Sequence, residues 1–243
     1  MPELGSWAVL IVGALVASII GGVAGFGAGV VMLPLVAWVV GFKAAVPVLT
    51  VTMFVGNLSR LWWSRRDVDL GVVGAFLAGA VPATALGAVL YAGASAESLG
   101  RVVGFFLLAS VPLRRLLASS RVRVRLVHFP LVGGAIGLLS ALVVTTGPVA
   151  TPFFLAYGLR RGAYLATEAL CSTGMHVVRG VALARYALLT GEAVLVGTVL
   201  GVVMFVGAWL ARRLVDRMSE RVFLVVLESL LVVLGLQFVL VPR

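Results

Sequence analysis

LGSWAVLIVGALVASIIGGVAGFGAGVVMLPLVAWVV, residues 4–40, contains no charged side chain. Its length exceeds the roughly 18 apolar residues that mark a candidate membrane span. A glycine-rich run interrupts it between residues 21 and 29, and glycine destabilises the interior of a helix. The stretch therefore predicts two membrane-embedded helices, at 4–22 and 28–41, that are separated by a break.

The composition extends this interpretation to the whole chain. Hydrophobic residues make up 62% and charged residues 12%, whereas a soluble domain carries about 25% charged residues. So few charges cannot cover a water-facing surface, which makes the lipid bilayer the expected surrounding. The net charge of +10 does not indicate a nucleic-acid partner, because the arginines lie in short loops between apolar segments, as in many membrane proteins.

Charges and turn residues divide the remaining chain into further helices, at 44–64, 69–92, 97–116, 126–143, 148–158, 162–186, 190–211 and 219–240. Segments 28–41 and 148–158 are too short to cross a bilayer core of about 30 Å comfortably. Each follows a break without charge, and the second break contains Thr145, Thr146 and Gly147. We expect two hairpins with tips inside the membrane, where they are buried in protein or line a wet cavity.

The two halves of the chain repeat. Pairs of residues match at a spacing of 118 (Gly29 with Gly147, Pro34 with Pro152, Gly56 with Gly174) and of 120 (Gly87 with Gly207, Arg101 with Arg221). Each half, 1–120 and 121–243, would hold one hairpin and three spans, so the second half starts on the opposite side of the membrane. The predicted fold is an all-α integral membrane protein of two inverted repeats, each a broken, re-entrant helical hairpin plus three transmembrane helices.

The arginines segregate under this topology. One face carries Lys43, Arg101, Arg185 and Arg243, and the other carries Arg60, Arg65, Arg66, Arg114, Arg115, Arg121, Arg123, Arg125, Arg160, Arg161, Arg212, Arg213, Arg217 and Arg221. Cytoplasmic loops are enriched in Lys and Arg, so the second face is expected to be cytoplasmic and both termini outside. The high ratio of Arg to Lys and the richness in Ala, Val, Leu and Gly suggest a prokaryotic genome, which implies an inner (cell) membrane.

Several motifs resemble one family. Residues 22–34, GVAGFGAGVVMLP, are similar to the glycine-rich motif that opens sulfite exporter TauE/SafE proteins, and residues 41–45 to the linker that follows it. Residues 201–214 and 231–236 resemble the late spans of that family. The resemblance implies transport of sulfite, sulfonates, sulfoacetate-like or related sulfur-containing anions. The second half departs from the family pattern, because Thr145 and Thr146 stand where a second glycine-rich run is usual.

The hairpin tips are candidate anion sites. A helix N-terminus offers unpaired N–H groups and a partial positive charge, and Gly25, Gly27 and Gly29 would let the backbone approach a ligand closely. In the second tip, Thr145, Thr146 and Gly147 would supply hydroxyl and amide donors. The alternative is structural, since small residues also serve helix packing in membranes and threonine also caps helices.

Segment 162–186 is the most polar span. Glu168, Ser172 and Arg179 share one face and His176 flanks it, and ionisable groups at membrane depth are usually functional. Arg179 is a candidate for direct anion contact, His176 for donation to substrate or proton carriage, and Glu168 for coupling. The structural alternative pairs Glu168 with Arg179, Arg160 or Arg161. In the matching helix, Asn57 would contact substrate or bond to another helix.

These features predict a secondary transporter that binds a small anion between the two tips in an alternating-access cycle. A membrane subunit of a multi-component uptake system and an anion channel are the alternatives. No Gly-x-Ser-Gly, His-Glu-x-x-His or P-loop motif occurs, so we expect no enzyme, no metal and no cofactor. Glu228 lies in the middle of the last span, where it would pair with an arginine or belong to a subunit contact, as in a homodimer.

Overall fold

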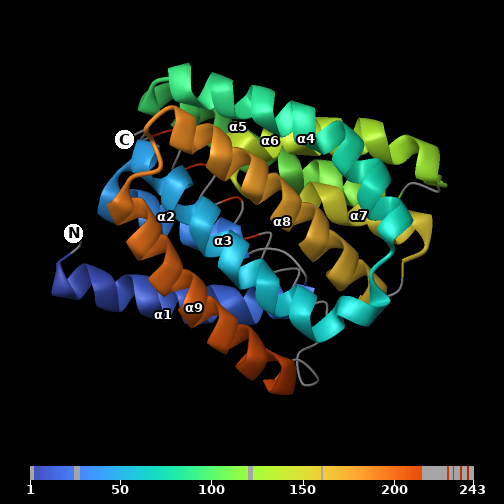
Figure 1. The fold of residues 1–243 in the computed structure, drawn as a ribbon, viewed down its shortest axis with the longest axis horizontal. Coiled ribbons are helices and arrows are strands. Elements are labelled where there is room, and N and C mark those ends of the chain that lie inside the picture. The colour runs from blue at the N-terminus through green and yellow to red at the C-terminus, as the bar shows by residue number, and fades with distance from the viewer. Residues whose placement is uncertain are drawn as a thin grey trace.

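The computed structural model describes residues 3–24, 28–119, 123–159 and 161–214, and the single positions 229, 232, 236 and 240. The described residues form helices and no strand (Figure 1). The helices are α1 (Leu4–Ala24), α2 (Ala28–Val40), α3 (Phe42–Ser64), η1 (Arg65–Asp67), α4 (Leu70–Gly93), α5 (Ala96–Ser119), η2 (Leu126–His128), α6 (Phe129–Val143), α7 (Gly147–Tyr157), α8 (Arg161–Arg185) and α9 (Gly191–Leu214). Predicted and observed helix ends agree within about one turn. The predicted helix at 219–240, with Glu228, lies outside the described residues apart from four positions.

Five helical segments are long and apolar enough to cross a membrane: Phe42–Trp62, Leu70–Gly93, Ala96–Leu113, Leu126–Val143 and Gly191–Trp209. Large apolar side chains also cover the outside of the bundle, for example Leu86, Phe105, Leu131 and Val206, each of which is more than half exposed. An apolar exterior on helices of this length belongs in lipid. The chain is an all-α, multi-pass membrane protein.

Helix α8 is long enough to span but too polar to be counted with these five segments. It packs against α3 and α4, and its polar residues Thr167, Glu168, Thr173, His176 and Arg179 are all buried. Charged groups in a membrane protein face the bundle interior rather than lipid. The inward orientation of α8 therefore explains its composition.

Local sequence sets several helix ends. The side chain of Asp69 caps α4 by accepting a hydrogen bond of 3.0 Å from the backbone N–H of Val72. Proline occupies the first turn of both α6 and α7, where its missing N–H costs nothing. Gly158 ends α7 in the left-handed conformation with φ of 106°, which favours glycine.

Small residues bring particular helices into close contact. A methyl group added to Gly137 on α6 would lie 2.6 Å from the carbonyl oxygen of Ala80 on α4, and one added to Gly133 would meet the carbonyl of Phe76. On the other side of the molecule, a methyl on Gly207 of α9 would meet Ser18 of α1. Close backbone approach through small residues is typical of membrane helix pairs, and here it fixes α6 on α4 and α9 on α1.

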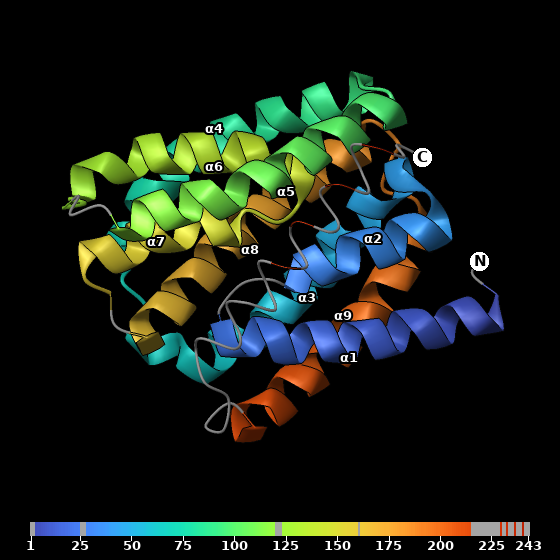
Figure 2. The same ribbon diagram turned by 180° about the vertical axis from the view of Figure 1, so that it is seen from behind.

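Two helix pairs are broken near the middle of the molecule. Figure 2 shows α1 and α2 extending from the centre to the end where the N-terminus lies, and α7 extending to the opposite end. Helix α1 ends at Ala24 and α2 begins at Ala28, and the residues between them, including Gly25 and Gly27, lie outside the described residues. The break between α6 and α7 is described in full. Equivalence of the two halves remains a prediction.

Candidate functional site

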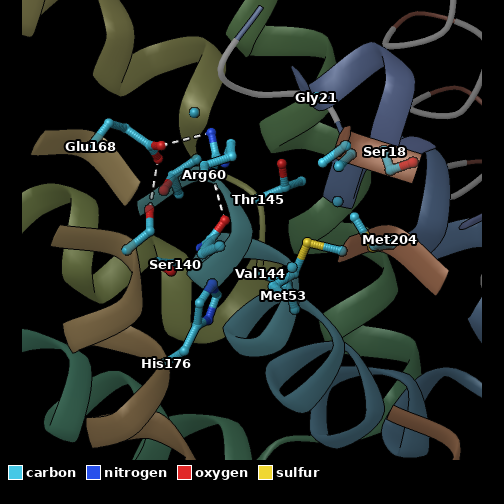
Figure 3. A pocket seen from close by; sticks show the side chains of 18 residues that line it. Ser18, Gly21, Met53, Arg60, Ser140, Val144, Thr145, Glu168, His176 and Met204 are labelled. Atoms are coloured by element: carbon cyan, nitrogen blue, oxygen red, sulfur yellow. Dashed lines mark hydrogen bonds and ion pairs between the residues drawn. The ribbon is translucent and has the colours of Figure 1, made fainter. Parts of the chain in front are cut away.

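The two helix breaks line one pocket. Ala28 and Gly29 at the start of α2 face it together with Thr145, Thr146 and Gly147 of the α6–α7 junction. A methyl group added to Gly29 would lie 2.9 Å from Cβ of Thr145, so the start of α2 touches the junction. The rest of the lining is Ser18, Gly21, Met53, Gly56, Asn57, Arg60, Ser140, Val144, Glu168, Ser172, His176, Met204 and Ala208, much of it labelled in Figure 3.

Val144 turns the chain sharply between α6 and α7. Its φ is 63°, a value that is unfavourable for a β-branched residue. The backbone N–H of Thr145 donates to the carbonyl of Val143 at 2.7 Å, which closes a three-residue γ-turn around Val144. Among the described residues, no acceptor faces the backbone N–H of Thr146 or Gly147. The strained turn therefore presents the N-terminus of α7 to the pocket.

An ion pair joins α3 and α8 on one wall. Nη1 of Arg60 lies 3.0 Å from Oε2 of Glu168, and Arg60 also donates to Oδ1 of Asn57. Oε1 of Glu168 accepts from the Ser172 hydroxyl at 2.7 Å. Figure 3 shows Arg60 and Glu168 extending toward each other across the pocket. The two charges offset each other, so this wall contributes little net charge.

Arg179 lies behind the pocket wall and is fully buried. Its Nε donates to Oγ1 of Thr50 at 2.9 Å, its Nη1 to the carbonyl of Ser140, and its Nη2 contacts Nδ1 of His176 at 2.6 Å. All three partners are uncharged acceptors, and no carboxylate pairs with Arg179 among the described residues. An arginine remains charged in proteins, so an uncompensated positive charge lies next to the pocket.

The family model of the sulfite exporter TauE/SafE proteins matches residues 9–238, almost the whole chain. The chain belongs to the sulfite exporter TauE/SafE family. No curated protein and no solved structure was found to match it. Membership makes the chain a membrane transporter of a family named for sulfite export.

The residues predicted for the site in this TauE/SafE chain fall into three groups. Gly29, Asn57, Thr145, Thr146, Gly147, His176 and Glu168 line the pocket. Arg179 does not line it, because α3, α6 and α8 enclose its guanidinium. Gly25 and Gly27 lie outside the described residues. Anion binding by any of these residues stays a prediction.

The ion-pair partner of Glu168 is Arg60 on α3, and none of the contacts described joins Glu168 to Arg179. Arg160 and the side chain of Arg161 lie outside the described residues, so those two pairings stay predictions. The sequences of both tips contain no acidic residue, but Glu168 places a carboxylate in the adjoining wall of the pocket. The positive character of the site therefore arises from Arg179 and the helix N-termini, with Arg60 neutralised by its partner.

Sequence reasoning missed Arg60 as a pocket residue and counted it among the arginines of the cytoplasmic face. A signal was present in the sequence, because Met53, Asn57 and Arg60 follow one another at helical spacing and so share one face of the helix. The assignment of Asn57 to the site could therefore have been extended to Arg60. Ser140 was also missed. It lies one turn before the α6–α7 break, and its carbonyl accepts from both the Val144 amide and Arg179.

Proposed function

We propose that this protein is a secondary transporter that binds a small sulfur-containing anion, such as sulfite, a sulfonate or a sulfoacetate-like molecule, in the pocket between the two helix breaks. The observation that carries the proposal is the uncompensated charge of Arg179 beside the pocket. A buried cation without a carboxylate partner is costly, and an anion in the pocket offsets that cost.

Hydrogen-bond donors in the pocket support an anionic ligand. The backbone N–H groups of Thr146 and Gly147 begin α7, where the helix dipole adds partial positive charge. The hydroxyls of Thr145 and Thr146, Nδ2 of Asn57 and the Nε2 of His176 have no partner among the described residues. Oxyanions accept several hydrogen bonds at once, so a wall rich in unused donors suits sulfite and sulfonate groups.

The ion pair between Arg60 and Glu168 offers a means of coupling. Arg60 lies in the last two turns of α3 and Glu168 in the second turn of α8, and both helix ends point to the same end of the molecule (Figure 1). When a proton neutralises Glu168, Arg60 gains an unopposed charge toward the pocket. We propose that proton binding at Glu168 and anion binding in the pocket favour each other in this way.

The orientation of the protein in the membrane is inferred from the positions of its arginines. The end of α3, the end of α5, the start of α8 and the end of α9 carry the arginine-rich segments, and Figure 1 places these ends away from the start of α1. We propose that this end faces the cytoplasm of a prokaryote, with the N-terminus outside. The pocket would open alternately to either side as the helix pairs move against each other.

Transport by the purified chain in liposomes tests the proposal. Vesicles loaded with sulfite should exchange it for external sulfite with saturable kinetics, and thiosulfate, sulfoacetate, taurine-like sulfonates and simple carboxylates should be ranked by competition. Flux that does not saturate and shows no exchange would indicate an anion channel. Absence of flux by the isolated chain, restored by further components of a cell extract, would indicate the membrane subunit of a larger uptake system.

A further inference from the structure

We propose that Arg179 is a positioning residue that fixes the tautomer of His176, so that the imidazole presents Nε2–H to the anion as a hydrogen-bond donor. The inference deepens the proposed function and rests on it for the identity of the ligand. It starts from the contact of 2.6 Å between Nη2 of Arg179 and Nδ1 of His176.

Only one arrangement of hydrogens is compatible with the contact between Arg179 and His176. A guanidinium carries five N–H donors and no acceptor, so Nδ1 of His176 must accept the hydrogen bond with its lone pair. A neutral imidazole has one N–H, and that hydrogen therefore resides on Nε2. An imidazolium would direct an N–H group at another N–H group. The contact thus selects the neutral ring with hydrogen on Nε2.

Arg179 is itself held rigidly in the orientation that this requires. The Thr50 hydroxyl donates to the carbonyl of Val46 at 2.7 Å and accepts from Nε of Arg179 at 2.9 Å. The Ser140 carbonyl accepts from Nη1. These partners come from α3 and α6, so three helices determine where the guanidinium points. With Nε and Nη1 engaged, Nη2 is directed at His176.

The other edge of the imidazole faces the pocket. His176 lines the cavity while being 5% exposed, and no described residue bonds to its Nε2. Figure 3 shows the ring of His176 extending from α8 toward the part of the pocket where Arg60 lies. Because no described residue accepts from this edge of the ring, Nε2–H is available to an acceptor atom of a ligand in the pocket. Unprotonated oxygens of a sulfite or sulfonate group supply that acceptor.

Nitrogen NMR of the protein labelled with ¹⁵N-histidine tests the tautomer directly. The chain has two histidines, and replacing the exposed His128 (His128→Asn) leaves the signals of His176 alone. We expect a neutral ring with hydrogen on Nε2 in the absence of ligand. Sodium sulfite should shift the Nε2 resonance and leave Nδ1 nearly unmoved, while sodium chloride should have little effect. A hydrogen on Nδ1, an imidazolium, or a sulfite response confined to Nδ1 would overturn the proposal.

Two substitutions at His176 separate the roles of the ring nitrogens. Glutamine extends its amide NH2 donor to about the position of Nε2, whereas the shorter asparagine places its amide near the position of Nδ1 and leaves the position of Nε2 empty. His176→Asn should lose at least about tenfold in sulfite affinity, the size of one hydrogen bond to a charged group, and His176→Gln should lose less. Equal affinity of both variants and the parent protein would contradict Nε2 donation.

Arg179→Met tests the positioning role. Methionine keeps apolar bulk but offers no donor, so the ¹⁵N spectrum should show both neutral tautomers in place of one. Because this variant leaves buried acceptors unpaired, Thr50→Val provides a milder test that frees only Nε, and it should broaden the tautomer distribution less. An unchanged single tautomer in Arg179→Met would refute the positioning role.

The tautomer measurement and the ligand measurement distinguish failure of this inference from failure of the proposed function. If His176 carries hydrogen on Nε2 but calorimetry detects no binding of sulfite or any other anion tested, the positioning by Arg179 stands and the donation to an anion is overturned together with the proposed function. If an anion binds while the hydrogen resides on Nδ1, the proposed function stands and the inference is overturned.

Discussion

At the scale of single residues, charge in and around the pocket is distributed unevenly. Arg60 is 3.0 Å from the carboxylate of Glu168, whereas Arg179 is enclosed by hydroxyl, carbonyl and imidazole acceptors. One cation is therefore neutralised and the other acts on whatever occupies the pocket. A substitution that removes a negative charge from the pocket should raise the affinity for an anion, and one that adds a negative charge should lower it.

Removal of the charge on Glu168 should strengthen anion binding. Two unit charges ~10 Å apart interact by ~1.5 kcal/mol at an effective dielectric constant of ~20, which corresponds to about tenfold in affinity. Glu168→Gln should therefore bind sulfite about tenfold more tightly in calorimetry at neutral pH, and a pH gradient across liposomes should no longer drive uptake. Glu97→Gln is the matched control, because it removes the carboxylate from an exposed Glu–Arg ion pair. Unchanged affinity in Glu168→Gln would refute competition between the carboxylate and the anion.

Addition of a negative charge at Asn57 should have the opposite effect. Aspartate has the shape of asparagine and can accept from Arg60 as Oδ1 of Asn57 does, but it loses the amide donor and adds a charge. Asn57→Asp should weaken sulfite binding at least about tenfold by the same Coulomb argument. The double variant Asn57→Asp with Glu168→Gln restores the net charge and should recover part of the affinity. If the double variant recovers no sulfite affinity, the loss is caused by the missing amide donor and not by the added charge.

At the scale of elements, the site depends on contact between two broken helix pairs. Gly29 begins α2 directly against Thr145, and Val144 makes the turn that presents α7 to the same pocket. Each element alone would be a helix end inside the protein. Their contact brings both ends to one cavity at the centre of the bundle.

Enlargement of Gly29 should separate the two breaks. A methyl group there would lie 2.9 Å from Cβ of Thr145, and overpacking of this kind costs about 1–3 kcal/mol. Gly29→Ala should lower sulfite affinity about tenfold and reduce exchange in liposomes. Gly74→Ala is the control, because Gly74 has no neighbouring atom within 4 Å; that variant should keep affinity. Adding Thr145→Gly to Gly29→Ala makes room but also removes one hydroxyl donor, so the double variant should bind sulfite as well as Thr145→Gly alone does. Weaker binding by the double variant than by Thr145→Gly would contradict the contact.

The extents of the helices were predictable from the sequence because charges and turn residues mark their ends. Asp69 caps α4 and Gly158 ends α7, and both signals are local. The two breaks were predictable for the same reason, since uncharged glycine and threonine runs interrupt apolar stretches. The partners of charged residues were not predictable, because Arg60 and Glu168 are 108 positions apart in the chain and only tertiary packing brings them together.

At the scale of the whole molecule, the arginine-rich ends of α3, α5, α8 and α9 set the expected orientation in the membrane. The positive-inside rule places such ends in the cytoplasm. Cysteine labelling in a background with Cys171→Ala, which removes the only cysteine, tests this. Ser119→Cys, at the end of α5, should react with a membrane-impermeant maleimide only in inverted vesicles. Ser95→Cys, an exposed site at the other end of α5, should react in intact cells; the reverse pattern would invert the topology.

The glycines that match between the two halves contact helices in a pattern expected for internal symmetry. Gly87 of α4 packs on α6, and its counterpart Gly207 of α9 packs on α1. Gly56 of α3 lies against Met204 of α9, and its counterpart Gly174 of α8 lies against Leu77 of α4. If α1, α3 and α4 correspond to α6, α8 and α9, each pair of matched glycines contacts corresponding helices.

An inverted repeat requires this exchange of partners between halves. We therefore predict that an experimental structure in lipid will superpose residues 4–116 on 126–240 through a pseudo-two-fold axis in the membrane plane. Matched substitutions offer an independent test, because both members of a matched pair should be sensitive to added bulk. Gly87→Ala and Gly207→Ala should each lower the thermal midpoint, since a methyl at either site meets the partner helix. An axis along the membrane normal, or tolerance of one substitution without the other, would contradict the symmetry.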